Sequence, residues 1–89
     1  MYNIIFEKRA KKQIDKLDNS VKKIIKKWLL KNLVGCENPR LHGKELTGNK
    51  SGLWRYRIGD YRIIADIQDD RLVIVAISIE HRKQVYKDN

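Results

Sequence analysis

The sequence is poor in cysteine, and this shortage excludes two kinds of covalent stabilisation. Its 89 residues contain one cysteine, Cys36, so the chain can form neither an internal disulfide bond nor a zinc site built from cysteines. A small protein without disulfide bonds is typical of a reducing compartment. We therefore expect a cytoplasmic protein that depends on its hydrophobic core for stability.

Long apolar runs and linker-like segments are also missing. No run of apolar residues approaches the length needed to cross a membrane, and the N-terminus lacks a signal-peptide pattern, so we expect a soluble protein without a membrane partner. Repeats and low-complexity tracts are absent, and 89 residues leave room for one core. Residues 1–89 are therefore predicted to form a single domain.

Histidine is scarce, and the motifs of several enzyme classes are missing. The two histidines, His42 and His81, do not lie at metal-ligand spacing from each other or from a carboxylate, so we expect neither a metal nor another cofactor. No glycine-rich phosphate loop follows a strand, and no Gly-x-Ser-x-Gly motif is present. These absences argue against metalloenzyme, nucleotide-binding and serine-hydrolase functions.

Acidic residues are few relative to basic ones. The chain has 11 acidic against 20 basic side chains and a formal net charge of +9, which is typical of proteins that meet nucleic acid or an acidic protein. Between residues 8 and 31, ten lysines and arginines face two aspartates. This excess indicates a surface that attracts a polyanion, although lysine-rich helices are also common as simple solvated faces.

The apolar spacing predicts the element order β-α-α-β-β-β. A β-prone run at 2–6 precedes two helical stripes, one at Phe6, Ala10, Ile14 and Leu17 and a wider one from Val21 to Leu33. Residues 40–52 form a glycine-punctuated loop, and strands follow at 53–58, 61–68 and 72–79. We therefore predict an α+β fold with a mostly antiparallel four-stranded sheet and a helical hairpin on one face.

The predicted hairpin at 53–68 concentrates arginine on one face of the sheet. At a period of two, Trp54 and Tyr56 share one face, while Arg55 and Arg57 lie on the other, and the second strand adds Arg62. The guanidinium group presents a planar fork of donors that suits phosphate. The alternative is that these arginines only solvate the open face or protect an exposed edge.

Three residues near the end of the chain extend this cluster, namely His81, Arg82 and Tyr86. Metal-free RNA cleavage requires a base for the ribose 2′-hydroxyl, fixed cations for the charge on phosphorus and an acid for the departing 5′-oxygen. Histidine can serve as base or acid, arginines can stabilise the charge, and tyrosine can stack on a base. The alternative for His81 is a polar residue that simply ends a strand.

With these residues in view, the chain resembles the RelE family of bacterial toxins within the RelE/ParE superfamily. The resemblance covers essentially the whole chain. It is carried by Asn38-Pro39-Arg40, His42-Gly43-Lys44-Glu45-Leu46-x-Gly48, the segment Trp54-Arg55-Tyr56-Arg57-Ile58-Gly59-Asp60-Tyr61-Arg62, the pair Asp69-Asp70, and the closing His81-Arg82-x-x-Val85-Tyr86.

The resemblance implies an mRNA endonuclease that needs no metal and acts in the A site of the ribosomal 30S subunit. It also implies a cognate antitoxin that blocks the basic site, and binding of operator DNA only through that complex. By position, Arg62 corresponds to the arginine that contacts the scissile phosphate, Arg82 to an arginine of proton transfer, and Tyr86 to a tyrosine that stacks on the substrate base. Arg55 and Arg57 correspond to the basic pair on the second strand, and we expect Lys44 to bind RNA or phosphate with them.

One departure from the family concerns the general base. The best-known member carries lysines where Arg55 and Arg57 stand, and one of those lysines is its proposed base. Arginine is a poor base because its pKa exceeds 12. The prediction therefore assigns the base to His81 and charge stabilisation to Arg57.

Two other functions remain open at this point. A gyrase-inhibiting toxin of the ParE branch would share the fold and act by binding a protein, and a non-catalytic module could bind RNA or protein through the basic helices. The combination of Arg62, His81, Arg82 and Tyr86 favours RNA cleavage, because a gyrase inhibitor has no need of that set.

Overall fold

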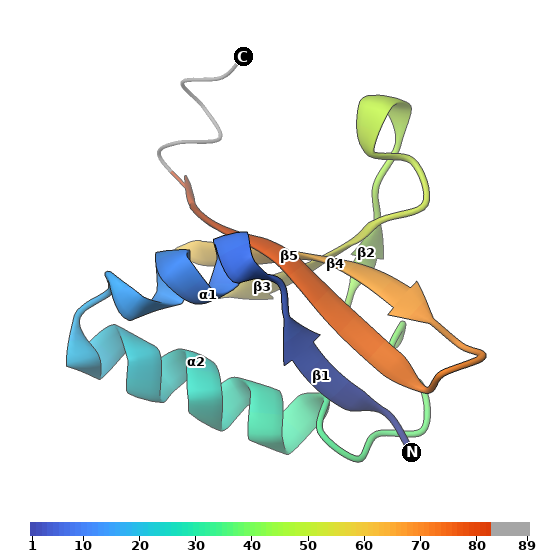
Figure 1. Cartoon of the computed structure of the whole chain (residues 1–89), viewed down its shortest axis with the longest axis horizontal. Coiled ribbons are helices and arrows are strands. Elements are labelled where there is room, and N and C mark those ends of the chain that lie inside the picture. Colours follow the sequence, from blue (N-terminus) through green and yellow to red (C-terminus); the bar gives the residue numbers. More distant parts are fainter. Residues whose placement is uncertain (83–89) are drawn as a thin grey trace.

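The computed structural model describes residues 1–82, in which two helices pack against a five-stranded sheet (Figure 1). The sheet order is β1-β5-β4-β3-β2. The α+β class is confirmed, but the sheet has five strands rather than four because a short strand inside the predicted loop pairs with β3. The elements are β1 (Asn3–Phe6), α1 (Lys8–Asp15), α2 (Asn19–Asn32), β2 (Lys44–Glu45), the 3₁₀ turn η1 (Gly48–Lys50), β3 (Trp54–Ile58), β4 (Tyr61–Gln68) and β5 (Val73–His81).

The two helices follow the predicted apolar stripes. Ala10 of α1 and Ile25 and Leu29 of α2 are buried against the sheet. The chain leaves α2 through Gly35, whose φ of +77° lies in the left-handed region that glycine adopts without strain. No helix within residues 1–82 is long and apolar enough to span a membrane.

Strand β1 pairs in parallel with β5, a pairing that the sequence does not specify. The pairing ends at Phe6, opposite Ala76, and β5 continues five residues further to His81. Beyond that point the side chain of α1 Gln13 replaces a strand, since its Oε1 accepts a hydrogen bond of 2.7 Å from the Ile79 amide. Helix α1 therefore covers the edge of β5 that β1 leaves open.

An irregularity in the pairing of β4 with β5 determines which way the end of β5 faces. Ile64 pairs with Ser78, but the next residue, Ala65, pairs with Ala76, so Ile77 is an extra residue in β5. Such a β-bulge reverses the alternation of side chains on either side of it. Ile74 and Ala76 before the bulge and Ile79 after it all belong to the helix-covered core, as those pairings require.

The chain between α2 and β3 is held by Tyr56, whose side chain is fully buried. Its hydroxyl donates a hydrogen bond of 2.6 Å to the Pro39 carbonyl, and burial raises its pKa. A Cβ atom at Gly43 would lie 2.8 Å from Tyr56 Cε1, so glycine permits this close approach. The contact brings β2 beside β3 and places Lys44 opposite Arg55.

Candidate functional site

Basic side chains gather on the face of the sheet that the helices leave uncovered. Residues directly opposite each other in an antiparallel pair share a face, so the register defines two rows across the strands. Arg57 of β3, Arg62 of β4 and Glu80 of β5 form the first row. The second row is Lys44, Arg55, Ile64 and Ser78. The structure therefore brings the predicted Lys44, Arg55, Arg57 and Arg62 onto one face.

A pocket of about 200 Å³ opens at the end of the first row. Its lining comes from Arg57, from Gly59 and Asp60 of the hairpin turn, from Arg62 and from Arg82. Three guanidinium groups from separate segments thus surround a space large enough for a phosphate group, with one carboxylate among them. Three of the residues that the sequence predicted for the site therefore lie together.

Asp60 determines where Arg82 lies. The Arg82 amide donates a hydrogen bond of 2.8 Å to the Asp60 carbonyl, which joins the end of β5 to the β3–β4 turn. The Arg82 Nη1 atom lies 3.8 Å from Asp60 Oδ1, and both side chains are more than 60% exposed, at 62% and 66%, so this ion pair is weak. An anion in the pocket can therefore compete for Arg82. Sequence reasoning treated Asp60 only as a turn residue.

Arg55 carries an unsatisfied donor in the middle of the basic face. Within residues 1–82 its Nε atom is buried without a hydrogen-bond partner. Burial lowers the pKa of this guanidinium group, and the neighbouring charges of Arg57 and Arg62 lower it further. A buried donor without a partner is unfavourable, and so is the repulsion between like charges. A bound anion would relieve both.

Glu80 is the carboxylate that the register places in the arginine row. It lies directly opposite Arg62, and its side chain is 22% exposed. Its Oε2 atom accepts a hydrogen bond of 3.4 Å from the Ser78 hydroxyl and lies 3.7 Å from Lys50 Nζ. Sequence reasoning missed Glu80 because simple alternation through β5 puts it on the helix-covered face.

His81 does not join the pocket. It pairs with Tyr61, on the face of the sheet that carries Ile79 and the helix-packed core. The two rings meet edge to face with their centroids 4.9 Å apart. The bulge is the physical reason, because without it the alternation from Val75 would turn His81 toward the arginines. Tyr86, the remaining predicted site residue, lies outside the described residues.

His42 lies away from the basic face. Its ring contacts Trp28 edge to face at a centroid distance of 6.3 Å, and Trp28 in turn packs against Tyr56 at 5.9 Å. These contacts support a structural role for His42. Within residues 1–82 no three histidine, cysteine, aspartate or glutamate side chains form a group that could hold a metal ion.

Comparison with protein families gives one match that spans most of the chain. The family described as "ParE toxin of type II toxin-antitoxin system, parDE" matches residues 4–86. The chain is 30% identical to the mRNA interferase toxin RelE of Escherichia coli over 90 residues, which cover 98% of this chain and 92% of that protein. Toxin RelG of Mycobacterium tuberculosis is 24% identical over 86 residues, or 97% of each protein.

Solved structures of similar proteins share the fold. The toxin–antitoxin complex RelBE2 of Mycobacterium tuberculosis matches with a TM-score of 0.82 and 25% identity, covering 91% of this chain and 98% of that chain. The isolated RelE toxin of Escherichia coli matches with a TM-score of 0.74 and 28% identity, covering 99% of this chain and 94% of that chain. The similarity thus extends over the sheet and the helical hairpin that together position the basic face.

Proposed function

Because the chain belongs to the RelE/ParE superfamily of type II toxins, we propose that it is a metal-independent endoribonuclease that cleaves mRNA in the ribosomal A site and arrests translation. The observation that carries this proposal is the pocket in which Arg57, Arg62 and Arg82 converge. The similarity to an mRNA interferase over 98% of this chain supports the same function.

In the proposed reaction the ribose 2′-oxygen attacks the adjacent phosphorus and the bond to the 5′-oxygen breaks. Arg62 binds the scissile phosphate, and Arg82 stabilises charge and assists proton transfer at the departing oxygen. Arginines in a preorganised cluster suit this role, since negative charge accumulates on phosphorus in the transition state. Arg57 stabilises the charge beside Arg62, Lys44 and Arg55 bind the flanking RNA, and Tyr86 stacks on a substrate base.

The assignment of His81 as general base stays a prediction. Its position beside Tyr61, behind the arginine row, separates it from the pocket. If His81 is a general acid or base, His81→Gln should lower single-turnover cleavage by roughly 10²–10⁴-fold. An effect under about threefold would move that role to another residue.

The proposed partners follow from the family. A cognate antitoxin would bind this chain, as the toxin–antitoxin complexes of the RelE relatives support, and we expect it to cover the basic face. The ribosome and its mRNA would be the target, and operator DNA would be bound only through the antitoxin complex. This activity requires a cytoplasmic protein.

A second candidate function is inhibition of DNA gyrase, because the matching family is described as a ParE toxin. The ParE and RelE branches share the fold, so topology does not separate them. The cellular response distinguishes the two functions, because a gyrase inhibitor would induce a DNA damage response and leave mRNA intact. A non-catalytic RNA- or protein-binding module would show salt-sensitive binding without cleavage.

The test is to map mRNA 5′ ends in cells minutes after induction of the wild type, Arg62→Ala and Arg82→Ala. We expect new in-frame ends within translated regions for the wild type and their loss in both variants. Arg71→Ala, which removes an arginine from the β4–β5 turn, is the matched control and should cleave normally. Full toxicity of both pocket variants would overturn the site assignment, and growth arrest with intact mRNA would favour the alternatives.

A further inference from the structure

We propose that Glu80 is the general base of this chain and accepts the proton of the ribose 2′-hydroxyl, an inference that rests on the proposed RNA cleavage. The observation behind this inference is the pairing register of β3, β4 and β5. Glu80 lies opposite Arg62, and Arg62 lies opposite Arg57, so a carboxylate and two guanidinium groups form one row on the open face.

The row brings Glu80 within reach of a phosphate bound to Arg62. Neighbouring strands lie about 4.8 Å apart, and directly opposite residues have Cβ atoms roughly 4.5–5.5 Å apart. A phosphodiester held by Arg62 and Arg57 would therefore lie on the same face of the sheet as the Glu80 carboxylate and next to it in the row. The bulge at Ile77 produces this placement, and bulges re-aim side chains next to active sites in other proteins.

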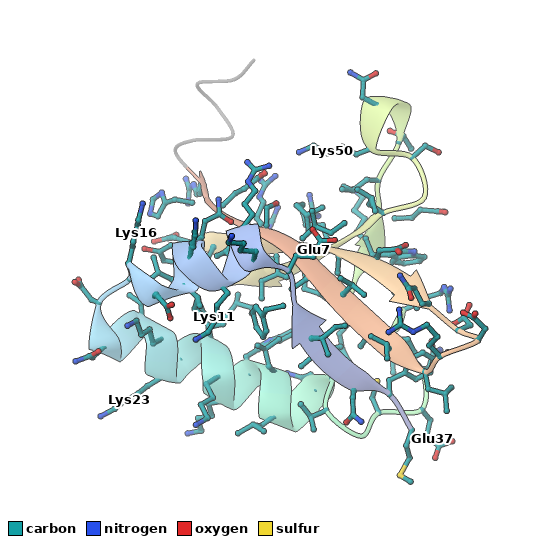
Figure 2. The ribbon with its side chains drawn as sticks, viewed as in Figure 1. Glu7, Lys11, Lys16, Lys23, Glu37 and Lys50 are labelled. Atoms are coloured by element: carbon teal, nitrogen blue, oxygen red, sulfur yellow. The ribbon has the colours of Figure 1, made fainter. Side chains whose placement is uncertain are left out.

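The surroundings of Glu80 hold its carboxylate and leave one oxygen available. The contacts with Ser78 Oγ at 3.4 Å and Lys50 Nζ at 3.7 Å are both made by Oε2. In the described part of the chain no hydrogen bond or ion pair engages Oε1. Lys50 belongs to η1, and Figure 2 shows its side chain extending from that turn toward the sheet. These contacts restrain the carboxylate through Oε2, and we infer that Oε1 is the oxygen that meets the substrate.

Asp60, the carboxylate that lines the pocket, fits this role less well than Glu80 does. Asp60 lies at the tip of the hairpin, is 66% exposed and already faces Arg82 Nη1 at 3.8 Å. A base has to meet the 2′-hydroxyl beside the arginines that bind the phosphate. Glu80, at 22% exposure in the arginine row, meets that condition.

The proton balance of the step is complete with RNA and water. Glu80 takes the 2′-hydroxyl proton as the 2′-oxygen bonds to phosphorus and the phosphorus–5′-oxygen bond breaks. The departing oxygen takes a proton that comes from solvent, a transfer that Arg82 assists. The products are a 2′,3′-cyclic phosphate and a 5′-hydroxyl end. Glu80 then returns its proton to solvent.

The experiment compares the wild type with Glu80→Gln in single-turnover cleavage of mRNA on programmed ribosomes. At saturating protein we expect the rate to fall by roughly 10²–10⁴-fold, as for other general bases. The half-saturating concentration should stay equal or decrease, because the substitution removes a negative charge from an RNA-binding face. Glu80→Asp, which keeps the carboxylate, should recover part of the rate. Glu37→Gln makes the same charge change in an exposed segment far from Lys50 and should behave as wild type (Figure 2).

A second substrate shows whether Glu80 acts as a general base or as a general acid. RNA with sulfur in place of the scissile 5′-oxygen has a leaving group that needs no proton. Glu80→Gln should remain slow on this substrate, whereas restoration of its rate would overturn the assignment as base. The assignment would also be overturned if Glu80→Gln cleaved ordinary RNA at a rate within threefold of wild type. If Glu80→Gln has a thermal midpoint so low that it is unfolded, Glu80→Asp decides instead: a folded Glu80→Asp variant that is equally inactive would overturn the assignment. Absence of cleavage by the wild type would instead overturn the proposed function itself.

Discussion

At the scale of single residues, Asp69 joins three distant parts of the chain. Its carboxylate accepts two hydrogen bonds from Arg40, at 3.0 and 2.8 Å, and one of 2.5 Å from the Tyr2 hydroxyl. Arg40 also lies over the Trp54 ring, 5.6 Å from its centroid. The residue just before β1, the segment before β2 and the β4–β5 turn therefore meet at one carboxylate. Arg40 is the main cause of the lowered pKa of Asp69, about 2, and Tyr2 adds to it.

The lowered pKa of Asp69 predicts that the stability of the fold depends on pH. Because the pKa of Asp69 is about 2 in the folded state and near 3.9 in an unfolded chain, its contribution is fully present above pH 5 and disappears as the pH falls toward 2. In urea titrations, the difference in free energy of unfolding between wild type and Asp69→Asn should be largest above pH 5 and shrink toward pH 2. Asp70→Asn removes the adjacent carboxylate and is the control. A wild-type-to-variant difference that is constant from pH 5 to pH 2 would contradict the prediction.

At the scale of elements, the sequence predicts the β3–β4 hairpin well because alternation is a local property. Arg55, Arg57 and Arg62 share a face in the structure as the period of two requires. The pairing of β1 and the two-residue strand β2 were not predictable, since both depend on contacts between distant segments. Strand β2 has only two residues, Lys44 and Glu45, so it is too short to show an alternating pattern.

The bulge in β5 explains the part of the site that sequence reasoning missed. A run that is almost wholly apolar gives no sign of where its alternation changes phase, so Ile77 cannot be recognised as the extra residue. The choice between Glu80 and His81 for the open face depends on that one residue. The residue types of the site could therefore be predicted, but the orientation of the last strand could not.

The β4–β5 turn contains a strained residue, and relieving the strain should stabilise the fold. Leu72 has a φ of +52° and is about half exposed, although a left-handed conformation costs an ordinary residue about 1–2 kcal/mol. Asparagine adopts this region more readily. We expect Leu72→Asn to raise the free energy of unfolding by about 0.5–1 kcal/mol and the thermal midpoint by roughly 2–8 °C.

The control for this prediction is Leu41→Asn, which makes the same chemical change at an exposed leucine whose φ is negative. It should leave the midpoint unchanged or slightly lower. Calorimetry of both variants is the measurement. An equal shift in the two would mean that backbone strain at Leu72 is not the cause.

At the scale of the whole molecule, positive charge covers two separate surfaces. The pocket arginines lie on the open face of the sheet. A second group of basic side chains lies on the helices, where Figure 2 shows Lys11 on α1, Lys16 just after α1 and Lys23 on α2. Lys23, Lys26, Lys27 and Lys31 line one shallow depression on α2. Among the described residues, no lysine of the helices lines the arginine pocket. We therefore expect the helix lysines to act on the approach and docking of a polyanion.

This separation predicts that the helix lysines affect association and not chemistry. Replacing Lys23, Lys27 and Lys31 together by glutamine should slow association with ribosomes by roughly three- to tenfold at low salt. The slope of log affinity against log salt should become shallower by about 0.7–0.9 for each phosphate that the variant no longer neutralises. The single-turnover cleavage rate at saturation should not change. The matched control replaces the same lysines by arginine, which preserves the charge, and stopped-flow binding measures both. Equal association rates for the glutamine and arginine variants would mean that the helices only solvate the fold.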